Sequence, residues 1–208
     1  LPLSARHSCG WRLLFRHAGR SAAIGERSVR NLLQRPERNA QMKRYQRYLL
    51  LLVIGGVVVA LDQATKIWVD QGMRLYGTES IIPGILDFHY IRNTGAAFGF
   101  LSGSESPFRI PFFVGISFLA IGIILYLFHK MEESEIVVPV ALSLVLGGAV
   151  GNLIDRIRLG EVIDFIYFHY KRFAWPAFNV ADIAITVGVF LLILRMFFLE
   201  KRRASEKK

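Results

Sequence analysis

The sequence predicts an all-α polytopic membrane protein with four transmembrane helices and a small extramembrane β element in the first loop on the non-cytoplasmic side. Three observations predict this class: 53% of the 208 residues are hydrophobic, long apolar segments carry no charge, and basic residues stand at both ends of the apolar body. About 20 apolar residues are enough to cross the ~30 Å of hydrocarbon in a bilayer. A chain this short and apolar favours one membrane domain.

Four segments have the length and composition of a membrane span. The first predicted helix covers residues 45–69 and carries Asp62 and Lys66 near its far end. The second and third cover residues 110–128 and 136–154 and contain no charged residue. The fourth covers residues 179–199.

Basic residues predict the orientation of these spans. They lie just before the first span and just after the fourth, at Lys43, Arg44, Arg47, Lys201, Arg202, Arg203, Lys207 and Lys208. Because positive charge is retained on the cytoplasmic side, we expect both termini to be cytoplasmic. The short loop 129–135 then faces the cytoplasm too, although arginines also occur in the opposite loops.

The two loops on the other side carry different patterns. In the first, 71–109, the alternation of Leu86, Phe88 and Tyr90 is followed by a small-residue turn at 93–95, which predicts a strand and a turn. The second, 156–177, is rich in aromatic residues. Because such rings prefer the headgroup level, we expect this loop to lie against the membrane surface.

The ends of the chain differ from the apolar body. Residues 1–41 hold eight arginines and two glutamates, a net +6 of the chain's +10. We expect this basic extension to be dispensable or to precede a translation start at Met42, with a membrane domain over 42–200 and a basic cytoplasmic tail over 201–208. The apolar body lacks the interleaved basic and aromatic residues of a nucleic-acid surface. With Cys9 as the sole cysteine, a disulfide framework and a thiol nucleophile are excluded.

Polar side chains cluster at the ends of the third and fourth spans. In GNLIDR, the spacing of Asn152, Asp155 and Arg156 predicts a shared helix face. In FNVAD, Asn179 and Asp182 are three residues apart at the start of the fourth span. Ionisable groups are costly in a bilayer and usually have a function there. The alternatives are a surface charge group for the first cluster and a helix cap for the second.

Two carboxylates at a membrane boundary suit a water-activating pair, in which one group accepts a proton and the other donates one. Spacing alone pairs Asp155 with Asp182. A proton- or ion-conducting protein is a second possibility, but it predicts polar residues in the middle of several spans. A structural subunit is a third, and it leaves the two Asn-x-x-Asp clusters unexplained. The pair Gly147 and Gly151 predicts close helix packing.

Five motifs in order carry a resemblance to a known family. They are LDQATKIW (61–68), RNTGAAFG (92–99), GNLIDR (151–156), VIDF (162–165) and FNVAD (178–182). The chain from about Met42 to Leu199 resembles the bacterial lipoprotein signal peptidase family, signal peptidase II. The resemblance implies an inner-membrane aspartyl endopeptidase with its active site at the periplasmic face. It also implies cleavage of diacylglyceryl-modified prolipoproteins before the lipidated cysteine, no metal or organic cofactor, and inhibition by globomycin.

The resemblance also assigns residues. Asp164 and Asp182 would be the catalytic pair, and five residues would line a polar pocket for substrate or globomycin: Asn93, Asn152, Asp155, Arg156 and Asn179. Asp62 would be structural, paired with Lys66. Because the family match chooses Asp164 where spacing chooses Asp155, we follow the match and expect Arg156 to hold Asp155 ionised. The dipole of the fourth helix favours ionised Asp182, which leaves Asp164 as the protonated partner.

Overall fold

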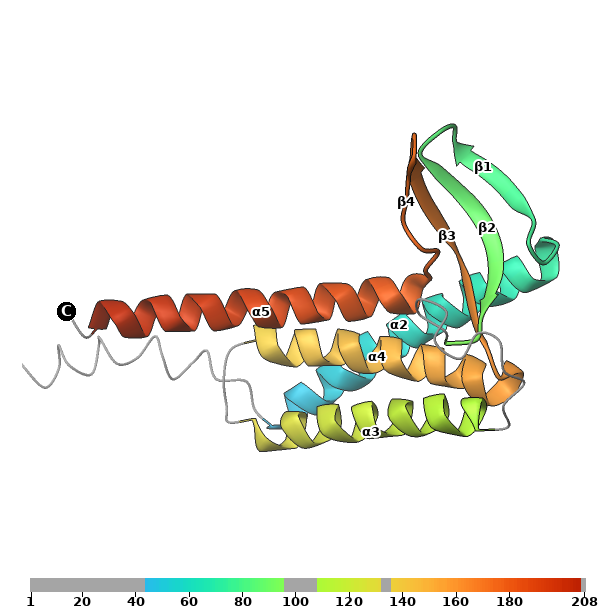
Figure 1. Ribbon diagram of the computed structural model, residues 1–208. Helices are drawn as coiled ribbons and strands as arrows, with labels where there is room; N and C mark the ends of the chain where they lie inside the picture. Colours follow the sequence, from blue (N-terminus) through green and yellow to red (C-terminus); the bar gives the residue numbers. More distant parts are fainter. Residues whose placement is uncertain (1–43, 96–107, 132–135, 207–208) are drawn as a thin grey trace, which may run out of the picture. The chain divides into compact units, whose positions relative to one another are not determined.

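The computed structural model describes residues 44–95, 108–131 and 136–206, with side chains up to residue 198. Within these ranges four helices are long and apolar enough to cross a membrane: α2 (Arg44–Gly72), α3 (Arg109–Lys130), α4 (Val137–Leu159) and α5 (Val180–Glu206). The predicted four-helix membrane fold is confirmed (Figure 1). The basic extension 1–41 lies outside the described residues.

The third helix is longer than predicted. α4 ends at Leu159 rather than at residue 154, because Gly160 stops it in the left-handed region at φ 75° and donates its N–H to the Arg156 carbonyl at 3.1 Å. The polar cluster that looked like the end of the span therefore lies within the last turns of a continuous helix. A backbone cap at glycine, rather than the first charged residue, sets this boundary.

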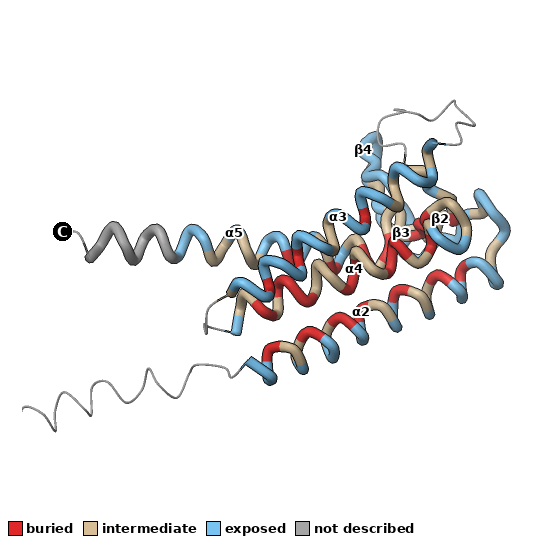
Figure 2. The backbone as a smooth tube through the Cα atoms, turned by 90° about the horizontal axis from the view of Figure 1, so that it is seen from below, coloured by how far each residue is buried: buried red, intermediate tan, exposed pale blue. Residues whose placement is uncertain are grey.

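α4 is the central helix of the bundle. Half of its most apolar window is buried, against 11 to 22% in the other three spans, and α2, α3 and α5 all pack on it. Figure 2 shows buried residues following one another along α4, whereas α2 alternates between buried and exposed positions. Glycines permit this close approach: a Cβ on Gly147 would lie 2.9 Å from the Gly55 carbonyl oxygen, and one on Gly148 would lie 2.4 Å from the Ala181 oxygen. A Cβ on Gly151 would lie 2.5 Å from Asp62 Oδ2, so the close packing predicted at Gly147 and Gly151 is confirmed.

A four-stranded antiparallel sheet stands at one end of the bundle (Figure 1). Its strands, in spatial order, are β1 (Thr78–Ile82), β2 (Leu86–Asn93), β3 (Val162–Tyr170) and β4 (Phe173–Ala174). The β element predicted in the first loop is confirmed, but the second loop also contributes two strands. β3 lacks a period-2 pattern because its first four residues, 162–165, are all buried, so the alternation that reveals a half-buried strand is missing.

Two contacts fix the sheet to the bundle. Val69 of α2 packs with Tyr90, Ile163 and Phe165 in one apolar cluster. Beside it the Tyr90 hydroxyl donates to Asp70, and the Arg92 guanidinium is 2.8 Å from the same carboxylate. The ends of β2 and β3 are thereby held where α4 ends and α5 begins.

Candidate active site

The seven predicted site residues come from four neighbouring parts of the fold. Asp164 is the third residue of β3, Asp182 lies in the first turn of α5, and Asn179 immediately precedes that helix. Asn93 ends β2, while the GNLIDR residues lie in α4. The hydrogen bonds below join six of the seven into one network, and Arg156 stands beside it.

Asp164 is a buried carboxylate held by two carboxamides. Its side chain is 1% exposed, Asn93 Nδ2 donates to Oδ2 at 2.9 Å, and Asn179 Nδ2 donates to Oδ1 at 2.7 Å. Burial raises the pKa of Asp164 to about 6; the Asn93 hydrogen bond opposes this rise, and the negative charge of Asp182 adds to it. Asp164 is therefore ready to exchange a proton near neutral pH.

Asp182 is more open and caps its own helix. Its Oδ1 accepts from Asn152 Nδ2 at 2.9 Å, and its Oδ2 accepts from the Asn179 backbone N–H at 3.3 Å. In return the Asp182 N–H donates to Asn179 Oδ1 at 3.0 Å. This reciprocal pair is a capping box, so the cap considered for this cluster does form. It also fixes the Asp182 carboxylate beside the amides that hold Asp164.

A buried lysine organises the other carboxylates. Lys66 Nζ, on a side chain that is 1% exposed, lies 2.8 Å from both Asp62 and Asp155 and donates to Asn152 Oδ1 at 2.9 Å. The predicted Asp62–Lys66 pair is confirmed. The cation in direct contact with Asp155 is Lys66 rather than the Arg156 expected from the sequence, because consecutive helix residues do not face each other. Sequence analysis missed Gln63, whose Nε2 donates to Asp155 Oδ1 at 3.0 Å.

The two aspartates of this cluster hold the backbone next to the site. Asp155 Oδ2 accepts the Ile163 N–H at 3.2 Å, and Asp62 Oδ1 accepts the Ala181 N–H at 2.9 Å. Each of these amides belongs to the residue immediately before a site carboxylate. Lys66, bound to both aspartates, thus sets where β3 and α5 present Asp164 and Asp182.

Arg156 departs from the predicted shared face. Its guanidinium points to α3, where Nη1 donates to Ser117 Oγ at 3.3 Å and Cζ lies 5.9 Å from the centre of the Phe113 ring. Asn152 and Asp155 instead meet at Lys66. Sequence analysis missed this role of α3, and the available signal was Ser117, a lone hydroxyl among apolar residues from 112 to 125.

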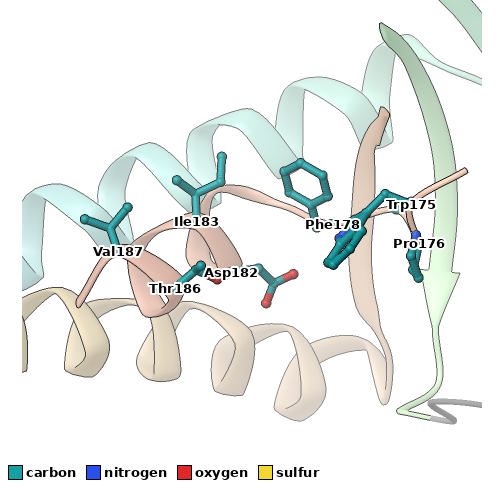
Figure 3. Close-up of a pocket in the computed structure, with 8 residues that line it drawn as sticks. Trp175, Pro176, Phe178, Asp182, Ile183, Thr186 and Val187 are labelled. Carbon is teal, nitrogen blue, oxygen red and sulfur yellow. The ribbon is translucent and has the colours of Figure 1, made fainter. Parts of the chain in front are cut away.

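An apolar cavity of about 410 Å³ opens beside Asp182. It is lined by the segment before α5 and by the first turns of that helix, through Trp175, Pro176, Ala177, Phe178, Asp182, Ile183, Thr186 and Val187. Figure 3 shows the Asp182 carboxylate as the charged group among these apolar side chains. Two carboxylates in unequal surroundings, one next to such a cavity, are able to act as acid and base on a bound molecule. Within the described ranges, no group of three or more His, Cys, Asp or Glu side chains could hold a metal.

Comparison with known proteins identifies the family. A family model described as "Signal peptidase (SPase) II" matches residues 54–198. The chain belongs to the signal peptidase II family. Its membership makes it a multi-pass membrane peptidase, as the sequence motifs predicted.

The match with two relatives in this family extends over nearly the whole length of each relative. A protein of Geobacter metallireducens named lipoprotein signal peptidase is 46% identical over 159 residues, which are 76% of this chain and 97% of that protein. Its namesake in Geobacter sulfurreducens is 47% identical over 163 residues, or 78% and 99%. A solved bacterial membrane enzyme shares 36% identity and the fold, with a TM-score of 0.64 over 76% of this chain and 91% of that one.

Proposed function

We propose that this signal peptidase is an intramembrane aspartyl endopeptidase with Asp164 and Asp182 as its catalytic pair. The observation that carries the proposal is that one amide residue, Asn179, contacts both carboxylates, one buried with a raised pKa and the other half-buried at a helix N-terminus. Such unequal surroundings favour one proton on the pair. A singly protonated pair is what water attack on a peptide bond requires.

The reaction needs no group beyond these two and water. Asp182 accepts a proton from water while protonated Asp164 donates one to the scissile carbonyl oxygen. The water oxygen joins the carbonyl carbon to give a tetrahedral diol. When the C–N bond breaks, the amine leaves with the proton from Asp182 and Asp164 recovers its own, so the pair returns to its starting state.

Asp155 is a poorer partner for Asp182. Its carboxylate lies 2.8 Å from buried Lys66 and accepts two further hydrogen bonds, from Gln63 and from the Ile163 N–H. These three contacts occupy a carboxylate that is 1% exposed, so Asp155 is committed to holding the Lys66 cluster and the backbone of β3. This supports the family's choice of Asp164 over the pairing that spacing alone suggested.

The substrate we propose is a diacylglyceryl-modified prolipoprotein, cut before its lipidated cysteine. The names of the relatives support a lipoprotein substrate. The cavity beside Asp182 supports an apolar one, because Ile183 and Val187 in its wall are also exposed on the outer face of α5. We infer that Asn93, Asn152 and Arg156 contact substrate or globomycin around the pair. We place the enzyme in the bacterial inner membrane with cytoplasmic termini and a periplasmic site.

The test is cleavage of a diacylglyceryl prolipoprotein by the purified full chain in detergent. Asp164→Asn and Asp182→Asn should each abolish cleavage while leaving the protein folded, because Asn keeps the size of the side chain but cannot exchange the proton. Asp87→Asn, on β2 and paired with His169, is the matched control and should keep full activity. Mass spectrometry should give a mature product that begins with the lipidated cysteine. Near-normal turnover by Asp164→Asn, with none by Asp155→Asn, would show that Asp155 is the partner instead.

A further inference from the structure

Arg156 stands near three carboxylates without pairing with any of them. The charges of Asp182, Asp164 and Asp155 all act on its guanidinium. Yet among the residues that the structure describes, no carboxylate oxygen lies within 4.0 Å of an Arg156 nitrogen. The guanidinium lies instead against two side chains of α3, those of Ser117 and Phe113.

The hydroxyl of Ser117 is the first contact that holds Arg156. Ser117 is 8% exposed, within an apolar helix, and its Oγ donates to the Phe113 carbonyl one turn earlier at 2.8 Å. This bond uses the hydroxyl hydrogen and leaves the oxygen lone pairs as acceptors. The Arg156 Nη1 then donates to that oxygen at 3.3 Å.

The ring of Phe113 is the second contact. The Arg156 Cζ lies 5.9 Å from its centre, within the range of a cation–π interaction. The same ring packs on the turn after β2, where a Cβ on Gly95 would lie 2.5 Å from a ring carbon. Gly95 is at φ 89° and donates its N–H to Asn93 Oδ1, while Asn93 in turn binds Asp164. The Phe113 ring therefore contacts both the Arg156 guanidinium and the turn whose Gly95 N–H holds the Asn93 side chain.

We propose that Phe113 and Ser117 are positioning residues that keep the Arg156 guanidinium off the catalytic pair, free to bind substrate. This rests on the proposed function of Asp164 and Asp182. A guanidinium at ion-pair distance would favour the charged form of both carboxylates and remove the shared proton.

The other charged groups that face the pair cannot substitute for this arrangement. Asp62 and Lys66 from α2 and Asp155 from α4 are joined to one another, because Lys66 Nζ lies 2.8 Å from both carboxylates. From β2 the facing group is the neutral amide of Asn93. Arg156 is thus the movable charge whose position α3 decides.

The experiment compares matched pairs of variants. Ser117→Ala is set against Ser143→Ala, which removes another buried serine whose Oγ donates to a carbonyl one turn earlier, that of Pro139, but contacts no arginine. Phe113→Leu is set against Phe118→Leu, which changes an exposed phenylalanine of the same helix. We expect Ser117→Ala and Phe113→Leu each to lower kcat/KM about tenfold, as for a lost hydrogen bond to a charged group. The alkaline limb of their pH profile should move to lower pH, because the released guanidinium favours loss of the shared proton. Ser117→Thr keeps a hydroxyl group and should retain the native kcat/KM and pH profile. The two control variants should leave kcat/KM and the pH profile unchanged.

A double-mutant cycle separates positioning from folding. In an Arg156→Ala background, Ser117→Ala and Phe113→Leu should have no further effect on the pH profile. Additive losses in that background, or an unshifted profile in the single variants, would overturn the proposal while Asp164→Asn and Asp182→Asn remain inactive. Activity retained by those two dyad variants would instead overturn the catalytic pair itself, and this proposal with it.

Discussion

At the scale of single residues, the site is defined by the orientation of three carboxamides. Each presents its NH₂ group to one of the two proposed catalytic carboxylates, and each has its oxygen engaged by another donor, which prevents the amide from flipping. These oxygen partners are the Gly95 N–H for Asn93, Lys66 Nζ and Asn179 Nδ2 for Asn152, and the Asp182 N–H for Asn179. Asp164 and Asp182 therefore face N–H donors, which oppose but do not cancel the effect of burial on Asp164.

The raised pKa of Asp164 predicts a pH dependence of catalysis. Above a pH of about 6 the buried carboxyl loses its proton, both members of the pair become charged, and no acid remains for the scissile carbonyl. We expect kcat/KM to be highest below this value and to fall tenfold per unit well above it. This alkaline fall in kcat/KM reports an apparent pKa of the pair rather than of one residue. Thermal unfolding over the same pH range is the control, and a profile that is flat into the alkaline range would contradict the prediction.

At the scale of elements, hydropathy was sufficient to predict the four helices, because each must cover a bilayer with apolar residues. Their ends were not predictable in this way, since the Gly160 cap extends α4 past its first charge. Burial on both faces concealed β3, the strand that carries Asp164. Spacing alone consequently paired Asp155 with Asp182, because both lie at the ends of predicted spans. In the structure Asp155 forms an ion pair with Lys66. Contacts between elements, such as Ser117 with Arg156, leave no periodic signal.

The packing of α4 against α5 gives a prediction at this scale. In Gly148→Ala the new methyl group would lie 2.4 Å from the Ala181 carbonyl oxygen, a backbone atom next to Asp182. The N-terminus of α5 must then move, so we expect a loss of about 1–3 kcal/mol in stability and a large loss of cleavage. Gly122→Ala in α3 is the control, because nothing lies within 4 Å of its Cβ and alanine favours a helix. Equal thermal unfolding and turnover of the two variants would contradict this account.

At the scale of the whole molecule, polar and apolar parts separate along the bundle axis. The sheet stands at one end (Figure 1), and the proposed catalytic pair lies there too, because Asp164 belongs to β3 and Asp182 to the first turn of α5. The Lys66 cluster lies beside them, since its two aspartates accept the N–H groups of Ile163 and Ala181. Exposed apolar side chains cover the outward faces of α2, α3 and α5, as a lipid environment requires. Aromatic rings of the β3–β4 hairpin are also exposed, among them Tyr170, Phe173 and Trp175. Their predicted place at the headgroup level follows the same separation and stays a prediction.

Contacts at one end of the bundle indicate which side faces the cytoplasm. At the end opposite the sheet, the Arg44 guanidinium lies 3.3 Å from His129 Nδ1, and Arg47 donates to the Met131 carbonyl at 2.8 Å. The start of α2 and the end of α3 thus share one side, which the positive-inside tendency assigns to the cytoplasm.

In a Cys9→Ser background, Lys130→Cys should react with a membrane-impermeant thiol reagent only after permeabilisation, whereas Lys171→Cys should react in intact cells. Both side chains are exposed, so access and not burial decides labelling. The reverse pattern would put Asp164 and Asp182 on the cytoplasmic side. Prolipoproteins whose cleavage site emerges on the far side of the membrane could not then reach the pair, so this labelling tests the orientation on which the proposed substrate depends.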